Sequence, residues 1–268
     1  MMRRTTGLAV GAGLVEGSAL AFLVETLVPR AGVEVLLGVA FVGATGLVVP
    51  IMAAGFVLYE VRENGRRTQK LVQIRSILGS LPLPVGGWAM EADLGSLLVH
   101  TIHERRPGLI VECGSGTSTV LAASVLRELG AGKILSLEHD EKFAEQTREN
   151  LRQRDLEEWA EVVTAPLVMR EVEGDQRRWY DVDLSAWTHG TIDMLVVDGP
   201  PRRSATLARY PAVPLLRDLM APGCTIVLDD GNRPDERAIA RQWSPLLGGK
   251  TRHARDGKGA WVFELPPV

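Results

Sequence analysis

Four of the apolar runs in this chain end in carboxylate side chains. Glu112, Glu138 and Asp198 each close such a run, and the pair Asp229–Asp230 closes a fourth. Carboxylates solvate poorly in a packed interior, so packing alone does not explain this recurrence. If the runs are parallel strands of one sheet, their carboxyl ends meet at the edge where ligands bind. The sequence therefore predicts a polar ligand site built largely from acidic side chains.

A glycine-containing turn follows the first of these runs. Residues 111–120 read VECGSGTSTV and precede a helix-like stretch. Glycines let the backbone turn tightly and approach a ligand, and the start of a helix offers free N–H groups. The turn lacks the lysine of a P-loop, and Thr119 stands where the dinucleotide fingerprint has its third glycine. Glu112 would repel a pyrophosphate, but it could accept hydrogen bonds from a ligand that carries an amino group and a sulfonium charge.

The acidic residue Glu138 lies 138 − 114 = 24 residues after the first glycine of that turn. An acid at the end of the second strand can accept both hydroxyls of a ribose. Dinucleotide sites and adenosyl sites share this feature. Glu138 therefore indicates an adenosine-type ligand without choosing between the two.

Asp198, Asp229 and Asp230 are predicted to lie at neighbouring strand ends. Three carboxylates within reach of one another repel unless a cation or a shared proton intervenes. An oxygen-preferring ion such as Mg²⁺ would suit such ligands. The alternative is structural: Asp229 or Asp230 caps the helix that begins near Pro234, and Asp198 bonds backbone N–H groups. Without a metal ion, Asp198 or His189 is the candidate general base.

The elements that must position these residues alternate along the second part of the chain. Such alternation is typical of an α/β fold with a parallel sheet and helices on both faces. The predicted strands are 109–113, 133–139, 161–165, 192–199, 224–230 and 259–265, with 250–255 as a weaker candidate. The predicted helices are 91–105, 117–129, 141–154, 204–220 and 234–245.

These motifs together resemble the class I S-adenosylmethionine-dependent methyltransferases. They are ECGSGTS, LEHD, VVDGP, a strand that ends in LDD and a final strand GAWVF. The resemblance covers about residues 88–266. It implies a Rossmann-like, seven-stranded methyltransferase sheet whose last two strands form an antiparallel hairpin.

The resemblance also implies S-adenosylmethionine as the cofactor. The first loop would hold its methionine part, with Thr117 where a third glycine is frequent. Glu138 would bind the ribose, His139 would lie beside the adenosine, and residues after the third strand would flank the adenine. The full set implied for the cofactor is Glu112, Gly114, Ser115, Gly116, Thr117, Ser118, Glu138, His139, Ala165, Pro166 and Asp198.

The acidic strand ends are similar to those of the catechol and caffeoyl-CoA type of O-methyltransferases. That type binds a divalent cation through an acid after its fourth strand and an Asp-Asn pair after its fifth. Here the pair is Asp-Asp, so the implied metal ligands are Asp198, Asp229 and Asp230. Methyl transfer from a sulfonium is an SN2 displacement, which needs alignment and, often, proton removal. We expect Asp198 and Asp229 to serve O-methylation of a small or membrane-proximal acceptor.

Composition excludes several other classes of protein. The net charge of −3 and the absence of a long basic run argue against nucleic acid as a partner. Cys113 and Cys224 lie in apolar runs, which favours free core thiols over a disulfide. No zinc-binding spacing of cysteine and histidine is present.

The first 60 residues predict a membrane anchor. Residues 7–29 and 35–59 are long apolar stretches, and the second carries no charge before Glu60. Basic residues flank the pair, so the positive-inside rule predicts a transmembrane hairpin with both ends and the catalytic domain in the cytoplasm. Because Glu16 interrupts the first stretch, an interfacial helix or a signal peptide stays open for it. Residues 61–87 are predicted as a basic helical linker and 88–268 as the methyltransferase domain.

Two other functions remain open on the sequence. The first is an NAD(P)-dependent Rossmann oxidoreductase, against which Glu112 and the acidic strand ends argue. The second is a non-catalytic membrane adaptor that keeps the fold and oligomerises through its Gly-rich helices. Binding of NADH, or cofactor binding without turnover, would distinguish them from a methyltransferase.

Overall fold

The computed structural model describes residues 52, 54, 56–58, 61–62, 64–78 and 90–267 of the chain. The chain divides into two compact units, Met1–Arg66 and Arg67–Val268. The described residues of the first unit are helical. All predicted site residues belong to the second unit, which is the subject of the sections below.

The prediction of an integral membrane location is corrected by the structure. Among the residues that the structure describes, no helix is both long and apolar enough to cross a membrane. The predicted segment 7–29 lies outside the described residues. So does 35–59, apart from 52, 54 and 56–58.

A seven-stranded mixed sheet forms the centre of the second unit, in the order β3-β2-β1-β6-β7-β9-β8. Neighbouring strands from β3 to β7 pair in parallel, whereas β9 is antiparallel to both β7 and β8. The predicted Rossmann-like sheet and its terminal hairpin are confirmed. The strands are β1 Leu109–Cys113, β2 Lys133–Glu138, β3 Ala160–Thr164, β6 Ile192–Val197, β7 Met220–Asp229, β8 Lys250–Ala254 and β9 Ala260–Glu264.

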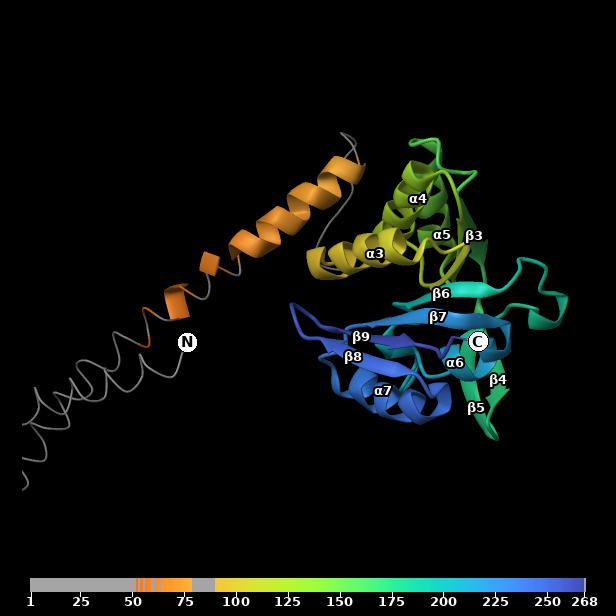
Figure 1. Cartoon of the computed structure of the whole chain (residues 1–268). Coiled ribbons are helices and arrows are strands. Elements are labelled where there is room, and N and C mark those ends of the chain that lie inside the picture. The colour runs from red at the N-terminus through yellow and green to blue at the C-terminus, as the bar shows by residue number, and fades with distance from the viewer. Residues whose placement is uncertain are drawn as a thin grey trace, which may run out of the picture. The chain divides into compact units, whose positions relative to one another are not determined.

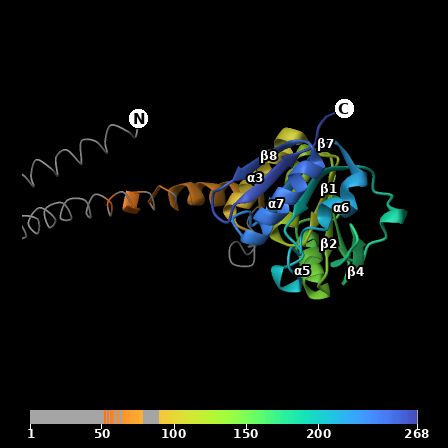
Figure 2. The ribbon, with the colours of Figure 1, turned by 90° about the horizontal axis from the view of Figure 1, so that it is seen from below.

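Helices cover both faces of this sheet (Figures 1 and 2). Side chains along β1 alternate between two cores: Ile110 packs with the first group of helices, and Val111 and Cys113 pack with the second. This alternation is what a strand buried on both faces requires. The first group is α3 Ala92–Arg105, α4 Thr117–Leu129 and α5 Glu141–Arg152, and the second is α6 Ala212–Leu216 and α7 Pro234–Leu247.

The strand order reverses between β1 and β6, which are neighbours although the chain visits β2 and β3 between them. Ligands of open α/β sheets bind beyond the carboxyl ends of the strands at such a switch point. The topology therefore places the predicted acidic strand ends where a ligand is expected.

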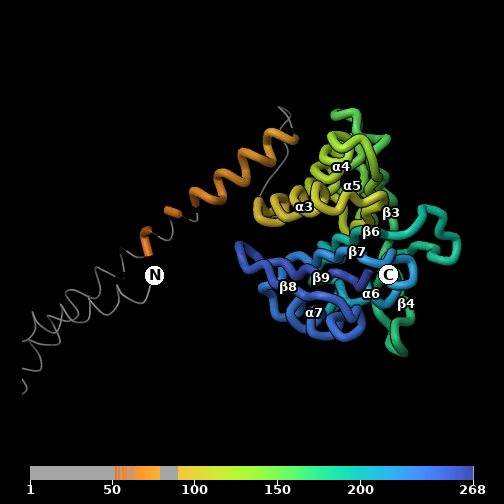
Figure 3. The backbone as a smooth tube through the Cα atoms, in the orientation of Figure 1, coloured from red at the N-terminus to blue at the C-terminus, as the bar shows by residue number. Residues whose placement is uncertain are grey.

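A β-hairpin that the sequence did not predict separates β3 from β6. It consists of β4 Leu167–Val172 and β5 Asp175–Tyr180, which form a two-stranded sheet of their own. The hairpin and the segment after it lie together at one end of the unit (Figure 3). The last two residues of β5, Trp179 and Tyr180, are buried at 2% and 1% exposure, so the hairpin contributes aromatic side chains to the core.

The helix predicted over 204–220 is wrong in its extent. The structure has only α6 there, with 3-10 turns at Arg202–Ser204 and Arg217–Leu219. Pro211 and Pro214 remove backbone donors and restrict the residues before them, so a long helix cannot run through this segment. Residues 205–210 instead form turns, in which Ala208, Arg209 and Tyr210 are buried.

Residues 67–78 are helical and pack on α3 within the second unit. Ile74 is 1% exposed, and its Cδ1 lies 2.7 Å from where a Cβ on Gly95 would be. Lys70 forms an ion pair with Asp93 at 2.6 Å. This part of the predicted linker is thus joined to the rest of the second unit by core packing.

Candidate active site

The glycine turn after β1 lies directly against the loop after β6. Gly114 has φ +94°, a left-handed conformation that favours glycine, and a Cβ there would lie 3.2 Å from the backbone nitrogen of Gly199. The N–H of Gly114 donates to the carbonyl of Leu137 at 2.8 Å. The turn is therefore fixed between the ends of β2 and β6.

Glu138 closes β2 and faces this turn. Its Oε2 accepts from the backbone N–H of Ser115 at 2.8 Å, and its Oε1 accepts from that of Asp140 at 3.0 Å. His139 Nδ1 lies 2.8 Å from the same Oε1. Glu138 is only 4% exposed, yet it lines a cleft. It is placed to exchange these backbone donors for the hydroxyls of a ligand.

Glu112 does not lie where the sequence analysis placed it. It is 0% exposed and points under the start of α4, where its Oε2 accepts from the hydroxyls of Thr119 (2.5 Å) and Ser136 (2.9 Å). Burial raises the pKa of Glu112 to about 7, although hydrogen bonds from Ser118, Thr119 and Ser136 oppose the shift. The expectation that Glu112 contacts a cationic ligand directly is therefore corrected. Glu112 instead holds the turn through Thr119 and Ser136.

A cleft of about 470 Å³ opens over the switch point. It is lined by seven of the predicted residues: Gly114, Ser115, Glu138, His139, Asp198, Asp229 and Asp230. The other predicted cofactor residues, Glu112, Gly116, Thr117, Ser118, Ala165 and Pro166, do not line it. His189 also lies elsewhere, in an exposed loop where its ring contacts Trp187.

The three aspartates at the ends of β6 and β7 meet in this cleft. Their carboxylates each offer an oxygen within 4.8 Å of the others. Neither Asp229 nor Asp230 caps α7, whose N-cap residue is Arg233. The purely structural alternative from the sequence is therefore not what the structure shows.

A buried guanidinium, which the sequence analysis missed, sits among these aspartates. The side chain of Arg209 is 4% exposed, and its Nη2 donates to Asp198 Oδ1 at 2.9 Å and to Asp230 Oδ2 at 2.8 Å. The same Nη2 donates to the carbonyl of Asp198 at 2.6 Å, and Nη1 donates to that of Asp229 at 2.9 Å. Burial lowers the pKa of Arg209, but the surrounding carboxylates outweigh that effect and raise it overall.

Crowding shifts the proton affinities of the aspartates. Burial, followed by the charges of Asp198 and Asp230, raises the pKa of Asp229 to about 8. Burial also raises the pKa of Asp198, although the charge of Arg209 opposes it. At neutral pH the Asp198–Asp229 pair therefore holds a proton that ordinary aspartates would have lost.

This donor set does not fit a divalent ion held by three free carboxylates. Two of the three predicted ligands, Asp198 and Asp230, each give an oxygen to one nitrogen of Arg209. Asp230 Oδ2 also accepts from Arg233 at 2.7 Å. A second cation between these oxygens would be repelled by the guanidinium.

Two aromatic residues in the cleft were also missed. Phe143, in the first turn of α5, is 50% exposed and lines the cleft, which is unusual for a large apolar side chain without a partner surface. Tyr180 reaches the cleft from the unpredicted hairpin. Of the two, only Phe143 could have been found from the sequence, because it follows the LEHD motif at the start of a helix.

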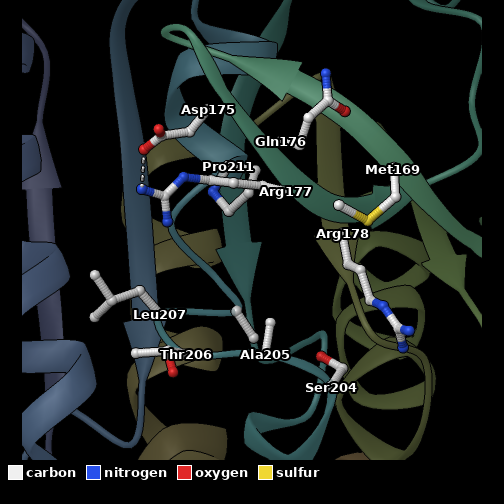
Figure 4. Close-up of a pocket in the computed structure, with 11 residues that line it drawn as sticks. Met169, Asp175, Gln176, Arg177, Arg178, Ser204, Ala205, Thr206, Leu207 and Pro211 are labelled. Atoms are coloured by element: carbon white, nitrogen blue, oxygen red, sulfur yellow. Dashed lines mark hydrogen bonds and ion pairs between the residues drawn. The ribbon is translucent and has the colours of Figure 1, made fainter.

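A second cavity of about 420 Å³ lies between the β4–β5 hairpin and Ser204–Pro211 (Figure 4). Arg177 lines it and donates to Asp175 at 3.0 Å. None of the predicted site residues lines this cavity. The chemistry suggested by the sequence therefore belongs to the first cleft.

The raised pKa of Asp229 predicts a pH-dependent effect of Asp229→Asn on stability. The folded chain holds the proton to about pH 8, whereas the unfolded chain loses it near 3.8, the ordinary pKa of an aspartate. The wild type therefore loses stability as the pH rises through this window, and the neutral asparagine does not. We expect the free energy of unfolding of Asp229→Asn, relative to wild type, to rise by at least ~1 kcal/mol between pH 5 and 8.5.

Urea unfolding at several pH values measures this difference. Asp218→Asn, which changes an exposed aspartate outside the cleft, is the matched control and should follow the wild type at every pH. If the free energies of unfolding of Asp229→Asn and wild type changed with pH in the same way, the assignment of the buried proton would be contradicted.

The comparisons with known proteins agree with this arrangement. Residues 111–231 match a family model described as a methyltransferase domain. No curated protein matches the chain significantly. A candidate caffeoyl-CoA O-methyltransferase from Staphylococcus aureus is similar in structure, with TM-score 0.52 and 13% identity over 68% of this chain and 86% of that one. A candidate O-methyltransferase from Klebsiella pneumoniae has TM-score 0.50 and 20% identity over 74% and 90%.

Structural likeness at such identities establishes the fold, and the family match covers the turn after β1, Glu138, and the ends of β6 and β7. Residues 111–231 therefore match a methyltransferase-domain model, and the second unit has the Rossmann-like fold of these structures.

Proposed function

We propose that this domain transfers the methyl group of S-adenosylmethionine to an oxygen atom of a small-molecule acceptor. The observation that carries the proposal is one cleft at the switch point that gathers the glycine turn, Glu138 and the acidic ends of β6 and β7. The O-methyltransferase names of the similar structures support the choice of oxygen.

The residues around the turn fit the adenosyl cofactor. Gly114 leaves its backbone open to the cleft, and Glu138 presents two carboxylate oxygens that accept from the backbone N–H groups of Ser115 and Asp140. Such a carboxylate can accept both ribose hydroxyls. The exposed ring of Phe143 offers an apolar face for a planar base.

The cofactor supplies a methyl group on a positively charged sulfur when it is bound. Displacement at that methyl group would form a C–O bond to the acceptor and release the sulfur as its C–S bond breaks. The Asp198–Asp229 pair takes the proton of the acceptor hydroxyl, because it lies in the cleft beside the turn and contains an ionisable carboxylate.

A dinucleotide fits the glycine turn less well than the adenosyl cofactor does. The third glycine of the dinucleotide fingerprint lets the helix approach the strand closely. Here that position is Thr119, which is 0% exposed and donates its hydroxyl to Glu112. The turn is thus held by a side chain that the dinucleotide fingerprint lacks.

Calorimetric titration of the full chain with S-adenosylhomocysteine tests the proposal. We expect micromolar binding to the wild type and at least ~10-fold weaker binding to Glu138→Ala, because hydrogen bonds to a charged carboxylate are lost. Glu141→Ala is the matched control, since Glu141 is an exposed acid three residues away that does not line the cleft.

A folded wild type that binds NADH but not S-adenosylhomocysteine would overturn the proposal in favour of an oxidoreductase. Equal binding by Glu138→Ala and wild type would contradict the ribose role of Glu138. Binding without methyl transfer to any of a broad panel of hydroxylated acceptors would favour the non-catalytic adaptor.

A further inference from the structure

The position of Arg209 differs from that of a charged side chain that merely lines a cleft. Its guanidinium joins the end of β6 to the end of β7, with bonds to the carbonyls of Asp198 (2.6 Å) and Asp229 (2.9 Å). It also bonds the carboxylates of Asp198 and Asp230 through one nitrogen. Glu236 Oε1 lies 3.8 Å from its Nη1.

We infer that Arg209 is the permanent cation of this site, which positions Asp198 and Asp230 so that methyl transfer proceeds without a divalent metal ion. The inference deepens the proposed function, because it concerns the same cleft. It makes Arg209 a positioning residue, which acts through the aspartates.

Arg209 Nη2 lies 2.9 Å from Asp198 Oδ1 and 2.8 Å from Asp230 Oδ2. A metal ion that bridged these two oxygens would compete with the guanidinium for them. An ion on the other oxygens, such as Asp230 Oδ1, would lie close to the same guanidinium and be repelled by it. A planar guanidinium with several fixed donors is suited to holding acceptors from two strands at once.

The charge of Asp230 is already compensated. Asp230 is 3% exposed and accepts from two cations, Arg209 and Arg233, at 2.8 and 2.7 Å. A buried carboxylate with two cationic partners needs no third cation to balance its charge. Binding of a dication would first require these contacts to break.

Arg209 also ties the two strand ends together. Arg209 bonds main-chain carbonyls at both strand ends, so it fixes the separation of β6 and β7 where the carboxylates leave the sheet. A metal ion bridging side chains would perform the same task. The side chain is 4% exposed, so water does not compete for its bonds.

Titration of the EDTA-treated full chain with Mn²⁺, followed by electron paramagnetic resonance and calorimetry, tests this inference. We expect the wild type to show no site tighter than about 1 mM, consistent with its filled cation position. Arg209→Met should bind Mn²⁺ at least ~10-fold more tightly, because it frees the oxygens of Asp198 and Asp230. A merely structural role of Arg209 would not create a metal site.

Arg233→Met is the matched control. Arg233 also bonds Asp230, but it is 39% exposed and has no bond to Asp198. It should therefore gain no Mn²⁺ site. A wild type that binds Mn²⁺ at micromolar concentration, with binding lost in Asp229→Asn, would overturn the inference, and so would a folded Arg209→Met with no gain in affinity.

If Arg209→Met does not fold, the wild type alone decides the question. Its affinity for S-adenosylhomocysteine and its melting temperature should be the same with EDTA and with about 0.1 mM Mg²⁺, which would fill a micromolar site but not one weaker than about 1 mM. A metal-dependent increase in either would overturn the inference. Absence of S-adenosylhomocysteine binding under both conditions would instead contradict the proposed function and leave the Mn²⁺ result standing.

Discussion

Replacing Gly199 with alanine is expected to weaken the binding of S-adenosylhomocysteine by about 10–100-fold and to lower the free energy of unfolding by about 1–3 kcal/mol. A Cβ on Gly199 would lie 3.1 Å from the carbonyl oxygen of Cys113 and 3.2 Å from Cα of Gly114. It would also collide with the hydroxyl of Tyr180. Because backbone cannot rotate away as a side chain can, the glycine turn must shift from β6, and the floor of the cleft changes shape.

The double variant Gly199→Ala, Tyr180→Phe separates side-chain from backbone crowding. The Tyr180 hydroxyl is buried and has no hydrogen-bond partner among the described residues. Its removal alone should leave the free energy of unfolding unchanged or slightly higher. In the double variant we expect stability to recover in part while ligand affinity stays low, because the contacts with Cys113 and Gly114 remain. Chemical unfolding and calorimetry measure both quantities, and wild-type affinity in Gly199→Ala would contradict the packing argument.

The first strand, turn and helix were predictable because local signals agree there. The strand 109–113 and the helix 117–129 have the predicted bounds. An apolar run, two glycines and a run of helix-forming residues follow one another directly, and each signal marks the same boundary. Tertiary contacts confirm these elements but are not needed to predict them.

The meeting of Asp198, Asp229 and Asp230 was predictable for a different reason. Parallel pairing of β6 and β7 brings their carboxyl ends to one edge, so residues far apart in the chain become neighbours. Once the strands and their order are inferred, the cluster follows from topology. The roles of its members do not follow, because they depend on what else lies between the strands.

Arg209 shows what the sequence could not reveal. It lies in 204–220, where apolar spacing predicted a helix, and an arginine in a helix is usually solvated. Its burial results from carbonyls and carboxylates of two distant strands converging on one loop. No local pattern encodes that convergence. The metal prediction treated the aspartates as uncompensated for this reason.

Glu112 was misplaced because β1 is buried on both faces. A strand with one solvated face alternates between apolar and polar residues, and the direction of each side chain can then be inferred. In LIVEC every residue is buried, so the pattern gives no direction. Glu112 shares a face with Ile110, which packs toward α3–α5, and its carboxylate there meets Thr119 at the start of α4. The hairpin β4–β5 was missed because most residues of β5, DQRRWY, are polar and resemble a loop.

Replacing Trp243 with alanine is expected to cost about 3–5 kcal/mol of the free energy of unfolding, the largest effect predicted for a single side chain here. Trp243 lies in α7 at 0% exposure and packs edge-on against Phe263, with ring centroids 5.8 Å apart. Its Nε1 donates to the carbonyl of Tyr210 at 3.0 Å. The variant loses buried apolar area, leaves a cavity and removes the donor that the carbonyl of Tyr210 accepts from. Trp187→Ala is the control, because Trp187 is only half-buried and bonds the local carbonyl of Gly190.

The hydrogen bond of Trp243 also links the core to the site, since Tyr210 adjoins Arg209. Trp243→Phe keeps an aromatic ring in the core but removes the donor to that carbonyl, so it should cost about 1–3 kcal/mol. If the loop depends on this bond, Trp243→Phe should also bind S-adenosylhomocysteine less tightly than wild type. This loss should remain at a temperature where the variant is fully folded. Chemical unfolding gives the first quantity and calorimetry on the folded variant gives the second. A variant that is destabilised yet binds like wild type would show that the bonds of Arg209 to Asp198 and Asp229 hold the loop without support from α7.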